Sequence, residues 1–324
     1  MDLNPKYDGY DFPFQSATPQ DGHPGHLTDQ QIAAIHQLRM MLEAEGYTER
    51  LDTLTLLRFL RARKFDVNLS KQMFVDCEKW RKEIKLDELV PVWDYPEKPE
   101  VSKMVALSIS RHSVEIDLTA MYKITTAERM LINLAVEYER VSDPRLPACS
   151  RKADSLVETS CSIMDLKGVT LTKVPSVYSY VRQVSVVSQN YYPERLGKLY
   201  LINAPWGFST VWSVVKGWLD PVTVGKVHIL GSGYKAELLK QVPAENLPKE
   251  FGGSCECEGG CMNSDAGPWH DPQWVRPPKW QKKEEGNKTE TKENETAAAI
   301  TSEKKDASET TGTEPTAAAQ VAGA

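Results

Sequence analysis

Between residues 156 and 230 the chain alternates between strand-like and helix-like patterns. Three short apolar runs read as buried strands, at 156–165, 198–203 and 226–230. The two segments between them carry apolar residues at helical spacing, and Pro175 stands in the first turn of the earlier one. Strands separated by helices run parallel and are joined by right-handed crossovers. The sequence therefore predicts an α/β fold with a mostly parallel sheet.

The part before the predicted sheet reads as a small helical bundle. Thr28-Asp-Gln-Gln31 is a capping box, and the apolar stripe behind it ends at Gly46. Two further helices are predicted over 54–62 and 69–84, because apolar residues recur there at helical spacing. Three short helices of this kind bury their apolar faces against one another.

Two proline-rich stretches interrupt the helical patterns. Residues 90–99 combine proline with bulky aromatic side chains and read as a linker between the bundle and the α/β part. A helix capped at Thr125 is predicted next, and Pro144 and Pro147 are expected to end it.

The two ends of the chain differ in composition from its middle. The first 27 residues are polar, and no aromatic residue follows Trp280. A stretch with so little apolar surface to bury stays unfolded. We predict a flexible N-terminal arm over 1–27, a helical domain over 28–95 and an α/β domain over 96–253. A C-terminal extension over 254–324 follows, and we expect it to be disordered after about residue 280.

Composition excludes several classes of protein. The chain has 324 residues, 40% of them hydrophobic, which is enough for a sizeable core. A net charge of −6 gives no general attraction to nucleic acid. No apolar run approaches the roughly twenty residues of a membrane-spanning helix, and the N-terminus lacks a signal-peptide pattern. We therefore expect a cytoplasmic protein whose attraction to phosphate is local.

Known catalytic and metal-binding patterns are missing. The chain contains no G-x-G-x-x-G, Walker or G-x-S-x-G motif, and its six histidines form no pair at metal or triad spacing. The six cysteines are expected to be reduced thiols. Cys255, Cys257 and Cys261 offer three thiolates without a matching second pair or histidine, so we predict no metal site. We expect neither an enzyme nor a cofactor.

An aromatic-rich segment lies between the second and third predicted strands. Read as a helix from Phe208, it places one apolar stripe along a single face, formed by Phe208, Val211, Trp212, Val215, Trp218 and Leu219. One interpretation is a helix packed on the sheet. The other is the movable wall of a cavity that opens onto a membrane, since tryptophan favours boundaries between apolar and wet regions.

Two polar patterns are candidates for binding an anionic or zwitterionic head group. Residues 58–64 hold four cations, which are either a solvated helix face or a phosphate site. Ser160 and Ser162 lie two apart on a predicted strand, so both hydroxyls point to one face. Buried hydroxyls need partners, which either neighbouring backbone or a ligand supplies.

Several segments together resemble the CRAL-TRIO lipid-binding family. Residues 55–66, which contain R-F-L-R-A-R-K, are similar to the family's N-terminal helical domain. The motifs of the lipid-binding domain are S-C-S-I-M-D-L-K-G, S-Q-N-Y-Y-P-E-R, I-N-A-P, L-D-P-V-T and L-P-K-E-F-G-G. In detail the chain resembles fungal phosphatidylinositol/phosphatidylcholine transfer proteins of the Sec-fourteen type. The resemblance extends from about Thr28 to Gly253.

The resemblance implies roles for individual residues. The positions that bind the inositol phosphate in the family fall on Arg63, Lys64, Glu194, Thr223 and Lys226. The positions that coordinate phosphocholine fall on Ser160 and Ser162 and, with fewer matching neighbours, on Ser188 and Tyr138. The apolar stripe matches the family's mobile gate helix. Gly253 matches a glycine whose replacement is expected to destabilise the fold.

One stretch departs from the family pattern. Between Lys103 and Ile116 the family normally has a tyrosine-rich stretch and a D-x-x-G-R-P-V-Y hairpin that includes a strand. Residues 104–115 of this chain are shorter and lack the tyrosines that contact the choline head group. Because both flanks match again, the pattern indicates an exon-boundary error or an alternative splice form.

The resemblance implies exchange of phosphatidylinositol and phosphatidylcholine between membranes, with phospholipid as the ligand. It further implies a functional link to phosphatidylinositol kinases, promotion of phosphoinositide synthesis and Golgi vesicle traffic, and a monomer that binds Golgi or endosomal membranes peripherally. The alternatives are a lipid-sensing adaptor without transfer activity and a carrier of another hydrophobic ligand, such as a sterol. A nucleotide-dependent enzyme is disfavoured by the missing glycine loop.

Overall fold

The computed structural model describes residues 3–17, 20–97, 122–167, 169, 174–262 and 264–281. The chain divides into two compact units, Met1–Arg276 and Pro277–Ala324, and the following account is of the first unit. The atypical stretch 104–115 and the tail predicted to be disordered, from residue 282 onward, lie outside the described residues.

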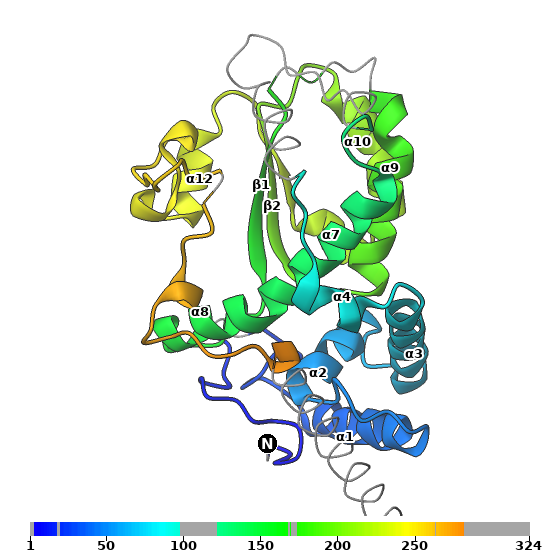
Figure 1. Cartoon of the computed structure of the whole chain (residues 1–324). Coiled ribbons are helices and arrows are strands. Elements are labelled where there is room, and N and C mark those ends of the chain that lie inside the picture. Colours follow the sequence, from blue (N-terminus) through cyan, green and yellow to red (C-terminus); the bar gives the residue numbers. More distant parts are fainter. Residues whose placement is uncertain are drawn as a thin grey trace, which may run out of the picture. The chain divides into compact units, whose positions relative to one another are not determined.

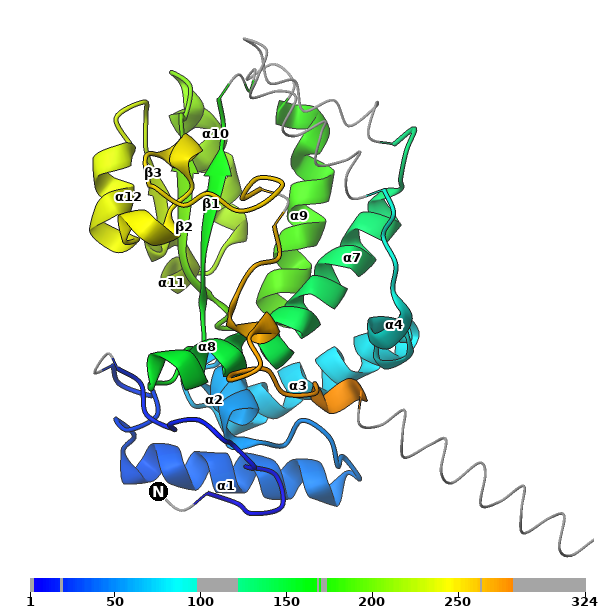
Figure 2. The same ribbon diagram turned by 60° about the vertical axis from the view of Figure 1, so that its left-hand side comes forward.

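The predicted helical bundle is confirmed. Its helices are α1 (Asp29–Ala44), α2 (Thr53–Ala62), α3 (Val67–Glu83) and α4 (Leu86–Val92), and α1, α2 and α3 contact one another (Figures 1 and 2). The capping box at Thr28 is present. The apolar faces form one core cluster, with fully buried side chains at Ile35, Leu38, Leu42, Leu56, Leu57 and Leu60. The linker predicted at 90–99 is wrong at its start, because α4 continues to Val92 through Pro91.

The described residues of the N-terminal arm, which we predicted to be flexible, make polar contacts with the bundle. The Asp8 carboxylate accepts hydrogen bonds from the Thr53 N–H at 2.6 Å and from the Thr53 hydroxyl at 2.7 Å, and it lies 3.6 Å from Arg39. The Tyr10 hydroxyl donates to Asp52 at 2.8 Å. These contacts satisfy polar groups at the start of α2 that the helix leaves unpaired. The polar arm therefore contacts the bundle through hydrogen bonds at the start of α2.

The predicted parallel sheet is also confirmed. Strands β1 (Ser160–Asp165), β2 (Leu196–Ile202) and β3 (Val227–Ile229) pair in that order, and both pairs are parallel. Strand β1 is shorter than predicted, because Leu156 bonds to Gln15 of the arm instead of to β2. The alternation of strand and helix patterns was sufficient to predict parallel strands.

Helices cover the two faces of this sheet (Figures 1 and 2). On one side lie α7 (Ala127–Arg140), α9 (Val174–Asn190) and α10 (Phe208–Val215), and on the other lies α12 (Lys235–Gln241). The short helices are α8 (Leu146–Ala153), α11 (Pro221–Gly225) and the 3-10 turns Lys216–Trp218, Ala244–Asn246, Lys249–Phe251 and Pro268–His270.

The helix that begins with α7 is capped by Thr126 and not by Thr125, and it ends just before Pro144, as predicted. In the following turn, Val141–Arg145, the backbone leaves the helical region at Asp143 (φ −157°, ψ 118°), and a second helix, α8, resumes beyond this kink with Pro147 in its first turn. Proline is tolerated there because the first N–H groups of a helix have no partner within it. Across the described ranges, none of the helices combines the length and the apolar character needed to span a bilayer.

Candidate functional site

Helix α10 turns the predicted apolar stripe toward the sheet. Phe208 and Val211 are buried against Leu201 of β2 and Leu166, and α9 adds Tyr178 to the same cluster. All six stripe residues are buried or half-buried, whereas the residues between them are exposed. The predicted amphipathic stripe is therefore confirmed. Its last part, Lys216–Trp218, is a 3-10 turn and not a continuation of the α-helix.

Side-chain amides fix the chain at both ends of α10. Before the helix, Asn203 Nδ2 donates to Asp165 Oδ1 at 2.8 Å. After it, Gln189 of α9 donates to the Trp218 carbonyl at 3.1 Å and accepts from the Asp220 N–H at 2.8 Å. The S-Q-N-Y-Y-P-E-R motif contains Gln189 but gives it no role, because only the tertiary structure brings the end of α9 beside the end of α10. These hydrogen bonds fix the backbone on both sides of α10.

Two residues predicted for the inositol phosphate form an ion pair. Lys226 Nζ lies 3.1 Å from Glu194 Oε2, and each side chain keeps about one-fifth of its surface exposed. The Lys226 N–H donates to the Thr223 carbonyl at 3.0 Å, which fixes Thr223 one turn before it in α11. The structure thus brings three of the five predicted residues to one place. A lysine there can serve as a point charge for a phosphate group.

The other two predicted cations lie at the end of α2. Arg63 lines a pocket of about 430 Å³ with Trp80 and Tyr191. Lys64 has a φ of +52°, and Glu194 a φ of +58°. A side chain in this left-handed region costs on the order of 1 kcal/mol, and such residues gather at functional sites. Among the described residues, no hydrogen bond or ion pair joins the end of α2 to Lys226 or Glu194.

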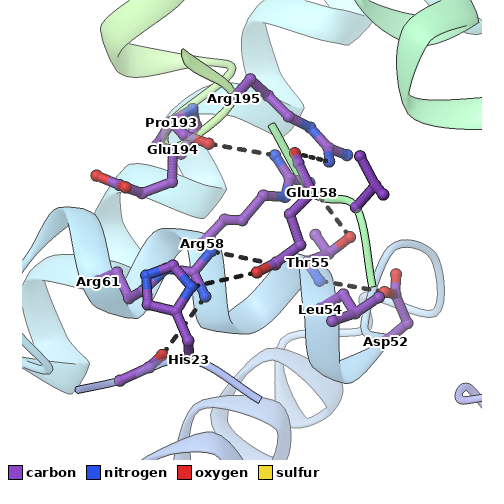
Figure 3. Close-up of polar contacts among 12 residues, drawn as sticks. His23, Asp52, Leu54, Thr55, Arg58, Arg61, Glu158, Pro193, Glu194 and Arg195 are labelled. Carbon is purple, nitrogen blue, oxygen red and sulfur yellow. Dashed lines mark hydrogen bonds and ion pairs between the residues drawn. The ribbon is translucent and has the colours of Figure 1, made fainter. Parts of the chain in front are cut away.

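The first two cations of the 58–64 run are neither a solvated face nor freely available to a ligand. Arg58 and Arg61 belong to a buried group that we name the arginine cluster, defined by Arg58, Arg61, Glu158 and Arg195 (Figure 3). Arg61 donates to the Glu158 carboxylate at 3.2 Å, and Arg195 donates to the Glu158 carbonyl at 3.2 Å. Arg58 is 3.5 Å from the Pro193 carbonyl. The cluster joins α2 to the loop that carries Glu194.

Figure 3 shows the Glu194 carboxylate directed away from this cluster, so the cluster positions the loop without neutralising that carboxylate. Burial and the nearby charge of Arg58 lower the pKa of Arg195 to about 9. Burial opposes ionisation of Glu158, but the hydrogen bond from His23 and the charge of Arg61 lower the pKa of Glu158 to about 2. Spacing along α2 was the only sequence signal for this cluster, since Arg58 and Arg61 share one helix face.

Replacement of Glu158 by Gln should make stability less dependent on acid pH. A carboxylate whose pKa falls from 4.5 in the unfolded chain to about 2 in the native state stabilises the protein fully above about pH 4.5. This contribution is lost as the pH falls toward about 2. Through this group, the free energy of unfolding of the wild type should be about 1.4 kcal/mol lower at pH 3.5 than at pH 6. The variant lacks the carboxylate and should show no such decrease from this position.

Urea unfolding at both pH values measures this difference. Because the variant leaves Arg61 buried without its carboxylate, we also expect a loss of about 3 kcal/mol at pH 6. Glu245→Gln, in an exposed 3-10 turn, is the matched control and should follow the wild type. If the stability of the wild type and of Glu158→Gln depended equally on pH, Glu158 would not have the lowered pKa that we assign to it.

The residues predicted for phosphocholine form two separate pairs. The Tyr138 hydroxyl donates to Ser188 Oγ at 2.9 Å, and burial raises the pKa of Tyr138. The Ser160 hydroxyl donates to the Arg195 carbonyl at 3.3 Å, so backbone already supplies a partner for it. Ser162 lies two residues further along β1. No hydrogen bond among the described residues joins the two pairs.

The face of β1 that carries Ser162 is the face toward α10. Ser162 and Met164 are in register with Leu199 and Leu201, which pack in the α10 cluster. Met164 is nevertheless 53% exposed. Met164 lies on the sheet face that the helices cover, yet about half of its surface is exposed. This exposure indicates that side chains pack incompletely on this face.

A small parallel sheet with helices on both faces, preceded by a helical bundle, defines a mixed α/β protein with a helical N-terminal region. The chain belongs to the CRAL/TRIO family. The family's N-terminal domain matches residues 34–76, and the CRAL/TRIO domain matches residues 120–253. The resemblance inferred from the motifs is thereby confirmed.

Relatives and a solved structure agree with this membership. The Sec14 cytosolic factor of Schizosaccharomyces pombe is 54% identical over 275 residues, which cover 82% of this chain and 96% of that protein. The phosphatidylinositol/phosphatidylcholine transfer protein SFH12 of Arabidopsis thaliana is 35% identical over 237 residues, 68% of this chain and 43% of that protein. The crystal structure of Sfh5 has a TM-score of 0.55 at 14% identity, covers 81% of this chain and 98% of that one, and shows the fold alone.

Proposed function

We propose that this protein transfers phospholipids between membranes by exchanging phosphatidylinositol for phosphatidylcholine. The observation that carries the proposal is its sequence identity, across most of the chain, to proteins named for this transfer and to Sec14 cytosolic factors. The half-exposed Met164 on the sheet face toward α10 supports an interior that takes up apolar chains.

The need for a carrier follows from the cost of exposing acyl chains to water. A diacyl lipid has about thirty methylenes, and at ~0.8 kcal/mol each their exposure costs on the order of 25 kcal/mol. A carrier lowers this barrier by keeping the chains covered throughout, and it needs a cover that opens only at the membrane. We assign this role to α10. Trp206, which lies just before α10 and is 97% exposed, is suited to the membrane interface.

Head-group charges would select between the two lipids. We assign the inositol phosphate to the lysine–glutamate pair of Lys226 and Glu194, with Thr223, Arg63 and Lys64 completing the site. Cations suit a phosphomonoester or phosphodiester, and hydroxyl groups suit a zwitterion. We assign phosphocholine to Ser160, Ser162, Ser188 and Tyr138.

The wider role is also a proposal. We infer that the protein acts as a monomer without cofactor or covalent step, presents phosphatidylinositol to lipid kinases, and works at Golgi or endosomal membranes. We assign residues 28–95 to the helical domain and 96–253 to the lipid-binding domain, with 1–27 and 254–324 outside both. The match of the two family domains to 34–76 and 120–253 supports this division.

Vesicle transfer assays test the proposal directly. Donor vesicles carrying labelled phosphatidylinositol or phosphatidylcholine are mixed with acceptor vesicles, and we expect the full chain to move both lipids. Mass spectrometry of the purified protein should find one of the two as bound ligand. Binding without transfer would favour a lipid-sensing adaptor, and a bound sterol with neither phospholipid would favour a different carrier. Either result would overturn the proposed exchange.

A further inference from the structure

Three cysteine thiols meet just beyond the lipid-binding domain, at Cys255, Cys257 and Cys261. The Sγ atom of Cys255 lies 3.8 Å from the Sγ atom of Cys257 and 3.8 Å from that of Cys261. All three sulfurs lie within 4.8 Å of one another, and each residue is half-buried. The sulfurs are free thiols, because a disulfide bond would require about 2.05 Å. The predicted phospholipid site does not use them.

Backbone interactions place the first thiol. The Cys255 N–H donates to the Leu247 carbonyl at 3.0 Å, and the Lys249 N–H donates to the Cys255 carbonyl at 3.3 Å. These bonds form a short parallel bridge between Pro248 and Cys255. The position of Cys255 is therefore set by the turn that precedes it and does not depend on the other two thiols.

A glycine turn returns the chain to this point. Gly259 and Gly260 have φ values of +73° and +89°, and the Gly260 N–H donates to the Cys257 carbonyl at 2.9 Å. Two successive left-handed residues are readily formed only by glycine. They reverse the chain within four residues, so that Cys261 comes back beside Cys255. A side chain at either position would oppose this reversal.

The sulfur separations match those of a tetrahedral metal–thiolate site. With zinc–sulfur bonds of about 2.3 Å, two sulfurs at the corners of a tetrahedron lie about 3.8 Å apart. The Cys255–Cys257 and Cys255–Cys261 separations both have this value. These sulfurs are thus already spaced as the ligands of one zinc ion would be.

We propose that Cys255, Cys257 and Cys261 bind one zinc ion through three thiolates. Within the described residues no histidine, aspartate or glutamate joins the cluster, so the fourth position would be taken by water or another small ligand. The ion would close residues 255–261 into a loop tied at Cys255, which backbone hydrogen bonds already hold to the preceding turn. The expectation of no metal, drawn from spacing alone, is thereby revised: the glycine turn creates a cluster that the C-x-C-x-x-x-C spacing does not reveal.

Metal analysis of the full chain tests the proposal. The protein is produced without a histidine tag and purified under reducing conditions without chelator, and plasma mass spectrometry is expected to find about one zinc per chain. Cys255→Ser, Cys257→Ser and Cys261→Ser should each weaken zinc affinity about 100-fold or more. Cys161→Ser, which removes an exposed thiol on β1, is the matched control and should keep its zinc.

Cobalt substitution gives a second measurement that does not depend on a variant folding well. After the wild-type metal is removed by a chelator, added Co²⁺ should give the sulfur-to-cobalt charge-transfer absorption of a tetrahedral thiolate site, and zinc should abolish it. The proposal is overturned if the wild type binds no zinc with its thiols reduced, if it holds only copper, or if zinc content is unchanged in all three cysteine variants.

Discussion

Replacing Lys226 with alanine is expected to slow phosphatidylinositol transfer by about 10- to 100-fold while leaving phosphatidylcholine transfer within about twofold of the wild type. A charge-assisted hydrogen bond to a phosphate contributes about 1.5–3 kcal/mol, which corresponds to this range. Glu194 would also lose the partner that lies 3.1 Å away. Parallel vesicle assays with labelled inositol and choline lipids measure both rates in one preparation.

Two further variants make this result specific. Lys240→Ala removes an exposed lysine that pairs with Glu237 on α12, and it should change neither rate. Ser162→Ile, on the strand face toward α10, should slow phosphatidylcholine transfer more than phosphatidylinositol transfer. An equal loss of both activities in Lys226→Ala would contradict separate head-group sites and would point to a general effect on the carrier.

Replacing Gly253 with alanine is expected to destabilise the protein by about 3 kcal/mol or more. A Cβ atom at this position would lie 1.9 Å from the Leu247 carbonyl oxygen and 2.6 Å from the Ala244 carbonyl oxygen. Those oxygens accept hydrogen bonds from the N–H groups of Cys255 and Ser254, so neither can move without breaking one. Contacts this short with fixed backbone belong to the most damaging class of substitution.

Thermal and urea unfolding followed by circular dichroism measure the loss. Gly231→Ala is the matched control, because a Cβ atom there would meet nothing within 4 Å and the residue lacks a positive φ. This control should remain within about 0.5 kcal/mol of the wild type. Near-wild-type stability of Gly253→Ala would mean that the turn at residues 244–255 can rearrange, and it would contradict the structural role expected for this glycine.

Local patterns predicted most of the described helices and strands. The capping box at Thr28, the apolar stripe from Phe208 and the three strands were each recognised from a few neighbouring residues, because helix caps and side-chain periodicity act over short distances. Predictions failed where distant residues intervened. Strand β1 starts late because Leu156 bonds to Gln15. The contact of Asp8 with Thr53 was likewise not visible in the sequence.

The candidate site divides in the same way. The motifs indicated which residue types belong to it, and Glu194, Thr223 and Lys226 do lie together. They include Gln189 and the three arginines of the arginine cluster, but they did not show that Gln189 holds the end of α10 or that the arginines meet at Glu158. In the sequence, Arg58 and Arg61 resembled a phosphate site. In the structure they are buried and bond to residues more than ninety positions away, so they position the loop that carries Glu194.

By itself the sequence determined the elements, their parallel order and the family, since these depend on periodicity, caps and motif order. The tertiary structure alone decided which charged groups and thiols meet. Lys226 and Glu194 are 32 residues apart, and three cysteines converge only because two glycines adopt a left-handed backbone. Electrostatic and metal-binding interactions depend on distances of a few ångströms through space, and separation along the chain does not determine those distances.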